Sequence, residues 1–167
     1  EIHQIIHLKR YRFFDIGIDH YYYDDYENER SITDIAERSY MPALETLLDM
    51  IKQGNGYFKV TFSISGVGME QLEMHAPQVI AKLQEINETG CAEFLAEPYS
   101  HGLSSLANEE SFAADVKKQC DKMKDYFGKR PTILRNSSLI YSDDIGGQVA
   151  FMGFKGMLTE GAKHVLG

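Results

Sequence analysis

No run of 18 apolar residues occurs in this sequence, which argues against a membrane-spanning helix. The two cysteines, Cys91 and Cys120, stand far apart and belong to no Cys-x-x-Cys or Cys/His spacing of the kind that holds zinc. We therefore expect both to be buried thiols in a reduced, cytoplasmic setting. Because the first residue is Glu1 rather than Met, the sequence leaves open a leader or an earlier strand.

Basic residues are also scarce, since 17 Lys and Arg stand against 25 Asp and Glu, for a formal net charge of −8. Such a charge repels phosphate backbones unless basic side chains gather on one face. Lys9, Arg10 and Arg12 form a short basic cluster, and three charges are too few for a nucleic-acid surface. We expect neither nucleic acid nor a membrane as a partner, and the sequence leaves the oligomeric state open.

Length and composition predict one folded domain, because 167 residues with 43% hydrophobic content can bury a sizeable core. Short apolar runs alternate with longer amphipathic segments, a pattern typical of βαβ units in a parallel sheet. We predict strands at residues 1–4, 59–65, 91–97, 132–136 and 156–160, and helices at residues 31–51, 70–88, 109–127 and 143–152. Pro42 is expected to kink or break the first helix.

Residues 5–30 interrupt the alternation with a long aromatic and charged insertion. An uncovered loop of that length is usually functional or disordered. Tyr21, Tyr22 and Tyr23 can stack on sugar rings, although any single tyrosine more often packs with one end in water.

A polar residue closes each predicted strand: these are His3, Ser65, Glu97, Asn136 and Glu160. The carboxyl ends of parallel strands meet at one edge, so these side chains are expected to converge on a single mouth. The alternative is that strand ends are polar because they meet solvent.

Glu97 is the strongest single candidate, because it ends the apolar run of residues 91–97. A carboxylate there lies at the rim of a sheet, where parallel-sheet enzymes keep their chemistry. The next loop carries Tyr99, whose ring can stack on a pyranose, and His101, which can bind a sugar hydroxyl or orient the loop. The alternative for Glu97 is an acid paired with arginine or capping the next helix.

His3 and His7 have a spacing that would make a two-ligand metal face on a helix. The residues between them indicate a strand end and loop instead. We therefore expect no metal site, and no cofactor is indicated.

Six segments together resemble the amylase-type and amylase-like members of glycoside hydrolase family 57. They are His3-Gln4, residues 11–15, residues 62–66, residues 93–97, Arg135-Asn136 with residues 140–143, and residues 157–162. The resemblance spans nearly the whole chain in the same order.

The resemblance implies an incomplete seven-stranded β/α barrel, of which residues 1–167 are the N-terminal portion with about five βα units. It also implies a retaining enzyme that hydrolyses or transfers the α-glucosidic bonds of oligo- or polysaccharides. The family nucleophile matches Glu97, and its His-Gln-Pro motif makes His3 and Gln4 sugar contacts. Ser65, Tyr99, His101, Asn136 and Glu160 are further candidate substrate contacts.

The sequence departs from the family pattern at Ile5, where proline is usual, and at Ser138, where an acid is usual. The family's general acid/base is an Asp in a later motif, and no such segment occurs before Gly167. We expect the isolated chain to be inactive and to expose a sheet edge. Two hypotheses therefore remain: an α-glucan hydrolase or glucanotransferase, and a catalytically impaired carbohydrate-binding protein.

Overall fold

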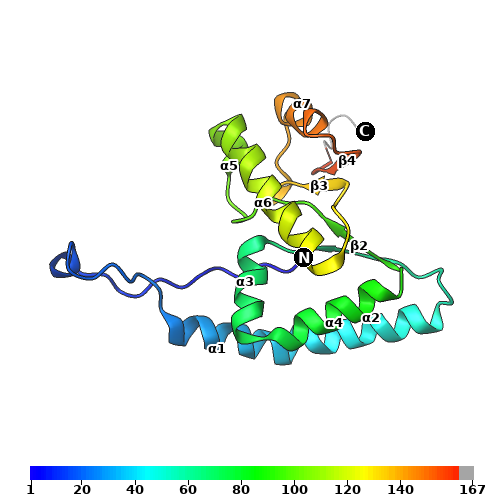
Figure 1. Cartoon of the computed structure of the whole chain (residues 1–167), viewed down its shortest axis with the longest axis horizontal. Helices are drawn as coiled ribbons and strands as arrows, with labels where there is room; N and C mark the ends of the chain where they lie inside the picture. Colours follow the sequence, from blue (N-terminus) through cyan, green and yellow to red (C-terminus); the bar gives the residue numbers. More distant parts are fainter. Residues whose placement is uncertain (162–167) are drawn as a thin grey trace.

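A parallel sheet in chain order organises the computed structural model, which describes residues 1–161 (Figure 1). Its strands are β1 (Val60–Ser63), β2 (Ala92–Leu95), β3 (Ile133–Arg135) and β4 (Gly156–Leu158). β1 pairs with β2 and β3 pairs with β4, both in parallel. Parallel bridges from Ile2 to Ile64 and from Ala96 to Leu134 join the first segment and the two strand pairs into one series of five. The predicted order of five parallel strand segments is confirmed.

One long helix lies across the lower face of the body in Figure 1, made of α1 (Asp25–Ile35), a π-helical turn (Ala36–Tyr40) and α2 (Met41–Gln53). It begins six residues before the predicted Ser31, because the Asp24 side chain caps it by accepting from the Glu27 N–H. The wider turn precedes Pro42, which has no N–H for a normal helical bond. Pro42 therefore changes the helix locally without ending it.

The predicted helix at residues 70–88 is wrong in two respects. The structure has two helices, α3 (Gly66–His75) and α4 (Pro77–Glu88), and the first starts at a cap formed by Ser65. Proline disfavours helical geometry in the residue before it, and Ala76 accordingly has φ −147° and ψ 56°. The chain turns at that point, so α3 and α4 pack on different parts of the long helix (Figure 1).

The remaining helices are α5 (Ser104–Ala107), α6 (Glu109–Phe127) and α7 (Asp143–Phe151). Asn108 caps α6, and Gly128 ends it with a positive φ of 75°. Short 3₁₀ turns occupy Phe13–Asp15 and Ser137–Leu139. No helix within residues 1–161 has the length and apolar character that crossing a bilayer requires.

Two apolar clusters form the core. The larger lies among α1 to α4, the end of α6, β1 and β2, where the Phe94 ring stacks on Phe127 with centroids 3.7 Å apart. The smaller joins Phe112 and Val116 of α6 to Leu134 of β3 and Val149 of α7. Both clusters hold the sheet against helices, which fixes the carboxyl ends of the strands.

Residues 5–24 form an arm that projects from the body (Figure 1). Its two sides pair in antiparallel fashion at Leu8 and Tyr23, and the Lys9 N–H donates to the Tyr22 carbonyl at 2.9 Å. Lys9 also pairs with Asp19 at 2.5 Å. The predicted insertion is therefore a hairpin-like arm, and it ends at Asp24 where α1 begins.

Candidate active site

Glu97 lies two residues beyond the end of β2, and its side chain is fully buried at 0% exposure. The Ser63 hydroxyl, from the neighbouring strand β1, donates a hydrogen bond to one carboxylate oxygen. The other oxygen lies 3.5 Å from Nδ1 of His101. Burial raises the pKa of Glu97, while the bond from Ser63 and the nearby His101 oppose that rise. The net effect is a raised pKa for the buried Glu97 carboxyl group, with burial as its largest cause.

Gln119 of α6 fixes the backbone around Glu97. Its side-chain oxygen accepts from the Glu97 N–H at 3.3 Å, and its amide nitrogen donates to the Ile64 carbonyl at 2.9 Å and to the Leu95 carbonyl at 3.3 Å. Gln119 is itself completely buried. One amide therefore links the ends of two strands to a helix and satisfies backbone groups that the parallel ladder leaves free.

His3 lies in the same group. Its Nδ1 is 2.7 Å from the Ser65 hydroxyl, and its ring stacks on His101 with centroids 4.3 Å apart. The Ser65 oxygen already accepts from the Gly68 N–H, which leaves the hydroxyl proton free to be donated to His3. Burial, followed by the neighbouring His101, lowers the pKa of His3. Both effects favour a neutral imidazole.

Glu1 and Arg135 complete the group, and sequence reasoning missed both as site residues. Arg135 donates two hydrogen bonds to the Glu1 carboxylate, at 2.8 and 2.7 Å. One Glu1 oxygen also lies 3.4 Å from Nε2 of His101. His101 therefore stands between two carboxylates, Glu1 and Glu97.

Glu1, Glu97 and His101 bring three potential metal-ligand atoms within 4.8 Å of one another. Both oxygens of Glu1 already accept from Arg135, and Glu97 accepts from Ser63. Arg135 thus places a positive charge directly against the Glu1 carboxylate, so the geometry favours a hydrogen-bonded network over a bound cation.

The other predicted site residues are placed differently. The Gln4 amide donates to the Tyr40 hydroxyl at 2.9 Å, toward the long helix. The Tyr99 ring is buried against Gly66, and its hydroxyl donates to Glu70. Tyr99 thus supports the helices, and the expectation that its ring offers a sugar-stacking face is wrong in this structure.

Asn136 and Glu160 follow the ends of β3 and β4 on the same edge. Asn136 is buried and donates to the Ser105 hydroxyl and the Ile140 carbonyl, each at 2.9 Å, so it ties two loops together. Glu160 is exposed, and its N–H donates to the Leu139 carbonyl at 3.2 Å. Neither side chain has a hydrogen bond to the Glu97 group among the described residues. Ala162, the last residue of the final family segment, lies outside them.

Backbone strain marks the same edge. His101, Ser138 and Leu139 have φ values of 53°, 53° and 56°, in the left-handed region that residues other than glycine rarely adopt. All three follow strand ends. Such residues cost on the order of 1–3 kcal/mol each and gather at functional sites, where surrounding contacts hold them in place.

Strand alternation was the signal that could have identified two of the missed residues. Ser63 stands two residues before Ser65, and Glu1 two residues before His3, so each pair faces the same side of its strand. The pairing of Glu1 with Arg135 depends on the curvature of the sheet and has no comparable local signal.

Comparisons with known proteins identify relatives of this chain. A family model described as glycosyl hydrolase family 57 matches residues 1–167. A curated protein of Methanocaldococcus jannaschii, named "Putative alpha-amylase", is 33% identical over 147 residues, which cover 87% of this chain.

Solved structures give the same fold. A 4-alpha-glucanotransferase from Thermococcus litoralis superposes with a TM-score of 0.68 at 16% identity, covering 77% of this chain and 20% of its own. A GH57 branching enzyme from Thermococcus kodakaraensis gives a TM-score of 0.61 at 11% identity, covering 77% of this chain and 35% of its own. The chain spans 31% of the length of the curated relative.

Proposed function

The chain belongs to glycosyl hydrolase family 57, and from that membership we propose that the protein acts on α-glucosidic bonds as a retaining α-glucan hydrolase or glucanotransferase with Glu97 as its nucleophile. The observation that carries the proposal is a fully buried carboxylate at the end of β2, held by Ser63 and His101. The names of the curated relative and of the two solved structures support the substrate class.

The geometry suits a nucleophile. In a retaining reaction one carboxylate attacks the anomeric carbon while a second carboxyl group, about 5–5.5 Å away, protonates the leaving oxygen and later activates water. The Ser63 bond stabilises the charged form of Glu97 that must attack, and Gln119 fixes the backbone that carries it. His3, neutral and stacked on His101, is placed to exchange hydrogen bonds with sugar hydroxyl groups.

Glu1 is a poor candidate for the second carboxyl group, although it lies close to Glu97. Both of its carboxylate oxygens are engaged by hydrogen bonds from Arg135, whereas a general acid must reach the leaving oxygen of the substrate. We propose instead that residues 1–167 are the N-terminal portion of one catalytic barrel, and that the Asp of the later family motif supplies the acid/base.

A second candidate is a carbohydrate-binding protein without turnover. It is favoured by the Glu1–Arg135 ion pair, because this pair engages a carboxylate that lies beside Glu97 and that turnover would need free. Such a protein would bind α-glucans and leave their bonds intact.

The two candidates are separated by measuring maltooligosaccharide turnover on the full-length protein, wild type and Glu97→Gln. We expect wild-type turnover with retained anomeric configuration, and a fall below about 10⁻³ of that rate in the variant, which keeps its fold because the replacement is nearly isosteric. A slow fluorinated glucosyl donor should add its glucosyl mass to the peptide that carries Glu97 in wild type only.

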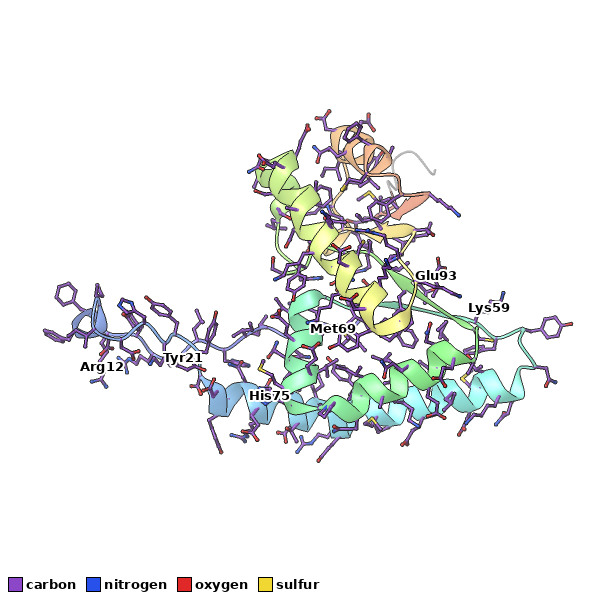
Figure 2. All side chains as sticks on the ribbon, viewed as in Figure 1. Arg12, Tyr21, Lys59, Met69, His75 and Glu93 are labelled. Carbon is purple, nitrogen blue, oxygen red and sulfur yellow. The ribbon has the colours of Figure 1, made fainter. Side chains whose placement is uncertain are left out.

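The matched control is Glu93→Gln, because Glu93 is an exposed carboxylate on the same strand (Figure 2). It should keep wild-type turnover. Undiminished turnover in Glu97→Gln would reject the nucleophile, and glucan binding without any wild-type turnover would establish the second candidate.

A further inference from the structure

A second pocket lies at the base of the arm, where the arm meets α1 and α3. Its volume is about 520 Å³, within the roughly 300–1,000 Å³ typical of small-molecule sites. Tyr21 of the arm and His75 at the end of α3, both labelled in Figure 2, belong to its lining. None of the lining residues belongs to the Glu97 group.

Two tyrosines supply aromatic rings to the lining. Tyr21 and Tyr23 are 50% and 47% exposed, and their rings meet edge to face with centroids 5.7 Å apart. The Tyr21 hydroxyl donates to Asp25 at 2.5 Å, which fixes that ring at the start of α1. Half-exposed rings held in this way offer flat, preorganised faces to a ligand.

The polar part of the lining consists largely of acceptors. Asp25 and Glu70 carry carboxylates, and Gln71 belongs to the same lining. Gln71 is 1% exposed, and its buried side-chain oxygen has no hydrogen-bond partner among the described residues. Its amide nitrogen donates to the Gln4 carbonyl at 2.7 Å, which fixes the orientation of the amide. A buried acceptor without a partner is rare and suits a ligand that brings a donor.

The charges in the pocket lining limit the class of ligand that the pocket can bind. No Lys or Arg contributes to the lining among the residues that the structure describes, so the pocket does not favour anions. Several acceptors beside exposed aromatic faces fit a neutral ligand that carries many hydroxyl groups and also has an apolar face. A pyranose ring has both.

The framework around the pocket is rigid. Asn28 of α1 accepts from the His7 N–H at 2.7 Å and donates to the His7 carbonyl at 3.2 Å, which fastens the arm to the helix. Ile6, which lines the pocket, is three residues from His3 of the candidate active site. An extended chain covers at most about 11 Å in three residues, so the pocket begins close to the candidate active site.

We propose that this arm pocket binds a glucosyl unit of the same α-glucan whose bonds are processed at Glu97. The identity of the sugar rests on the proposed function, whereas the pocket and its lining do not. A polymer held at the arm is retained near the active site between reactions, which lowers the KM for long substrates and leaves short ones unaffected.

The test compares Tyr23→Ala with wild type on the full-length protein. We expect the affinity for amylose, measured by electrophoresis in amylose-containing gels, to weaken roughly three- to tenfold, the range expected for loss of one aromatic contact. Turnover of maltotriose should not change. Tyr26→Ala is the matched control, because Tyr26 is 70% exposed on α1 and lies outside the pocket lining.

Met74→Arg provides a second variant that does not depend on the stability of the arm. Met74 is 65% exposed at the pocket, so its replacement spares the core and places a large cation against Asp25 and Glu70. It should weaken amylose binding by a similar factor. Unchanged amylose binding in both variants, or a lower melting temperature in Tyr23→Ala without weaker binding, would overturn the inference and leave the proposed function standing. A wild-type protein that neither binds nor cleaves amylose would overturn both.

Discussion

The hydroxyl of Ser63 on β1 donates a hydrogen bond to the carboxylate of Glu97 at the end of β2. The two residues are 34 positions apart, and the parallel register that places Ser63 opposite Leu95 brings them together. A hydrogen bond from a neutral donor stabilises the ionised carboxylate more than the protonated one. Ser63 therefore opposes the effect of burial on the pKa of Glu97.

Replacing Ser63 with alanine should move the acidic limb of the pH profile of kcat/KM to higher pH. The pKa of Glu97 is already raised by burial, and the substitution removes the hydrogen bond that counteracts the rise. At a pH on that limb we expect kcat/KM to fall about tenfold, with recovery at alkaline pH, since a bond to a charged group contributes about 1.5–3 kcal/mol. Thr61→Ala, at an exposed position two residues earlier on β1, should leave the limb in place. An unshifted limb in Ser63→Ala would separate Ser63 from the ionisation of Glu97.

The raised pKa of Glu97 should also affect how the stability of the protein depends on pH. A carboxyl group whose folded pKa lies above its ordinary value of 4.5 binds its proton more tightly in the native state. That stabilisation is fully present below the ordinary value and is lost as pH rises through the folded pKa. Glu97→Gln has no such ionisation, so its unfolding free energy relative to wild type should increase as pH rises above 4.5.

Denaturant titrations across that pH range provide the measurement. Glu93→Gln is the control for removing a negative charge, because Glu93 is exposed on the same strand. A Glu97→Gln difference that is constant with pH would mean that the Glu97 carboxyl is not destabilised by burial.

The strand order was predictable because each strand is a short apolar run separated from the next by a helix-length segment. The same reasoning placed His3, Ser65 and Glu97 on one edge, since parallel strands end together. Contacts confirm that placement of the side chains: His3 bonds to Ser65 and stacks on His101, which reaches Glu97.

Three features of the structure were not predicted from sequence patterns: the helix break, the arm and the packing of Tyr99. Pro77 is itself a local signal for a helix break. The prediction missed the break because the apolar pattern continues from residue 70 to residue 88. The arm is fastened to the body by Asn28 on a helix that follows it, so its placement depends on a contact outside its own residues. In the sequence, Tyr99 cannot be told apart from a tyrosine that stacks on sugar rings. Its packing on Gly66 becomes evident only in the structure, where the start of α3 lies against the ring.

Gly66→Ala should destabilise the protein by about 1–3 kcal/mol. An added Cβ would lie 2.1 Å from the Tyr99 ring, which is buried and cannot move easily because its hydroxyl bonds to Glu70. Gly147→Ala on α7 is the matched control: nothing lies within 4 Å of its Cβ position, and alanine in a helix gains roughly 0.5–1 kcal/mol over glycine. Tyr99→Leu in the Gly66→Ala background should recover part of the loss, and full additivity of the two substitutions would show that the predicted clash does not occur.

His101 offers a test that separates backbone strain from side-chain chemistry. Its φ of 53° lies in the left-handed region, where an alanine costs about 1–2 kcal/mol and a glycine costs little. We therefore expect His101→Gly to be more stable than His101→Ala by about 1 kcal/mol, the reverse of the usual order of these two residues. Both variants lose the imidazole between Glu1 and Glu97, so both should lose activity to the same extent. Equal stability of the two variants would show that His101 does not hold this backbone conformation, and activity retained in either would remove His101 from the candidate active site.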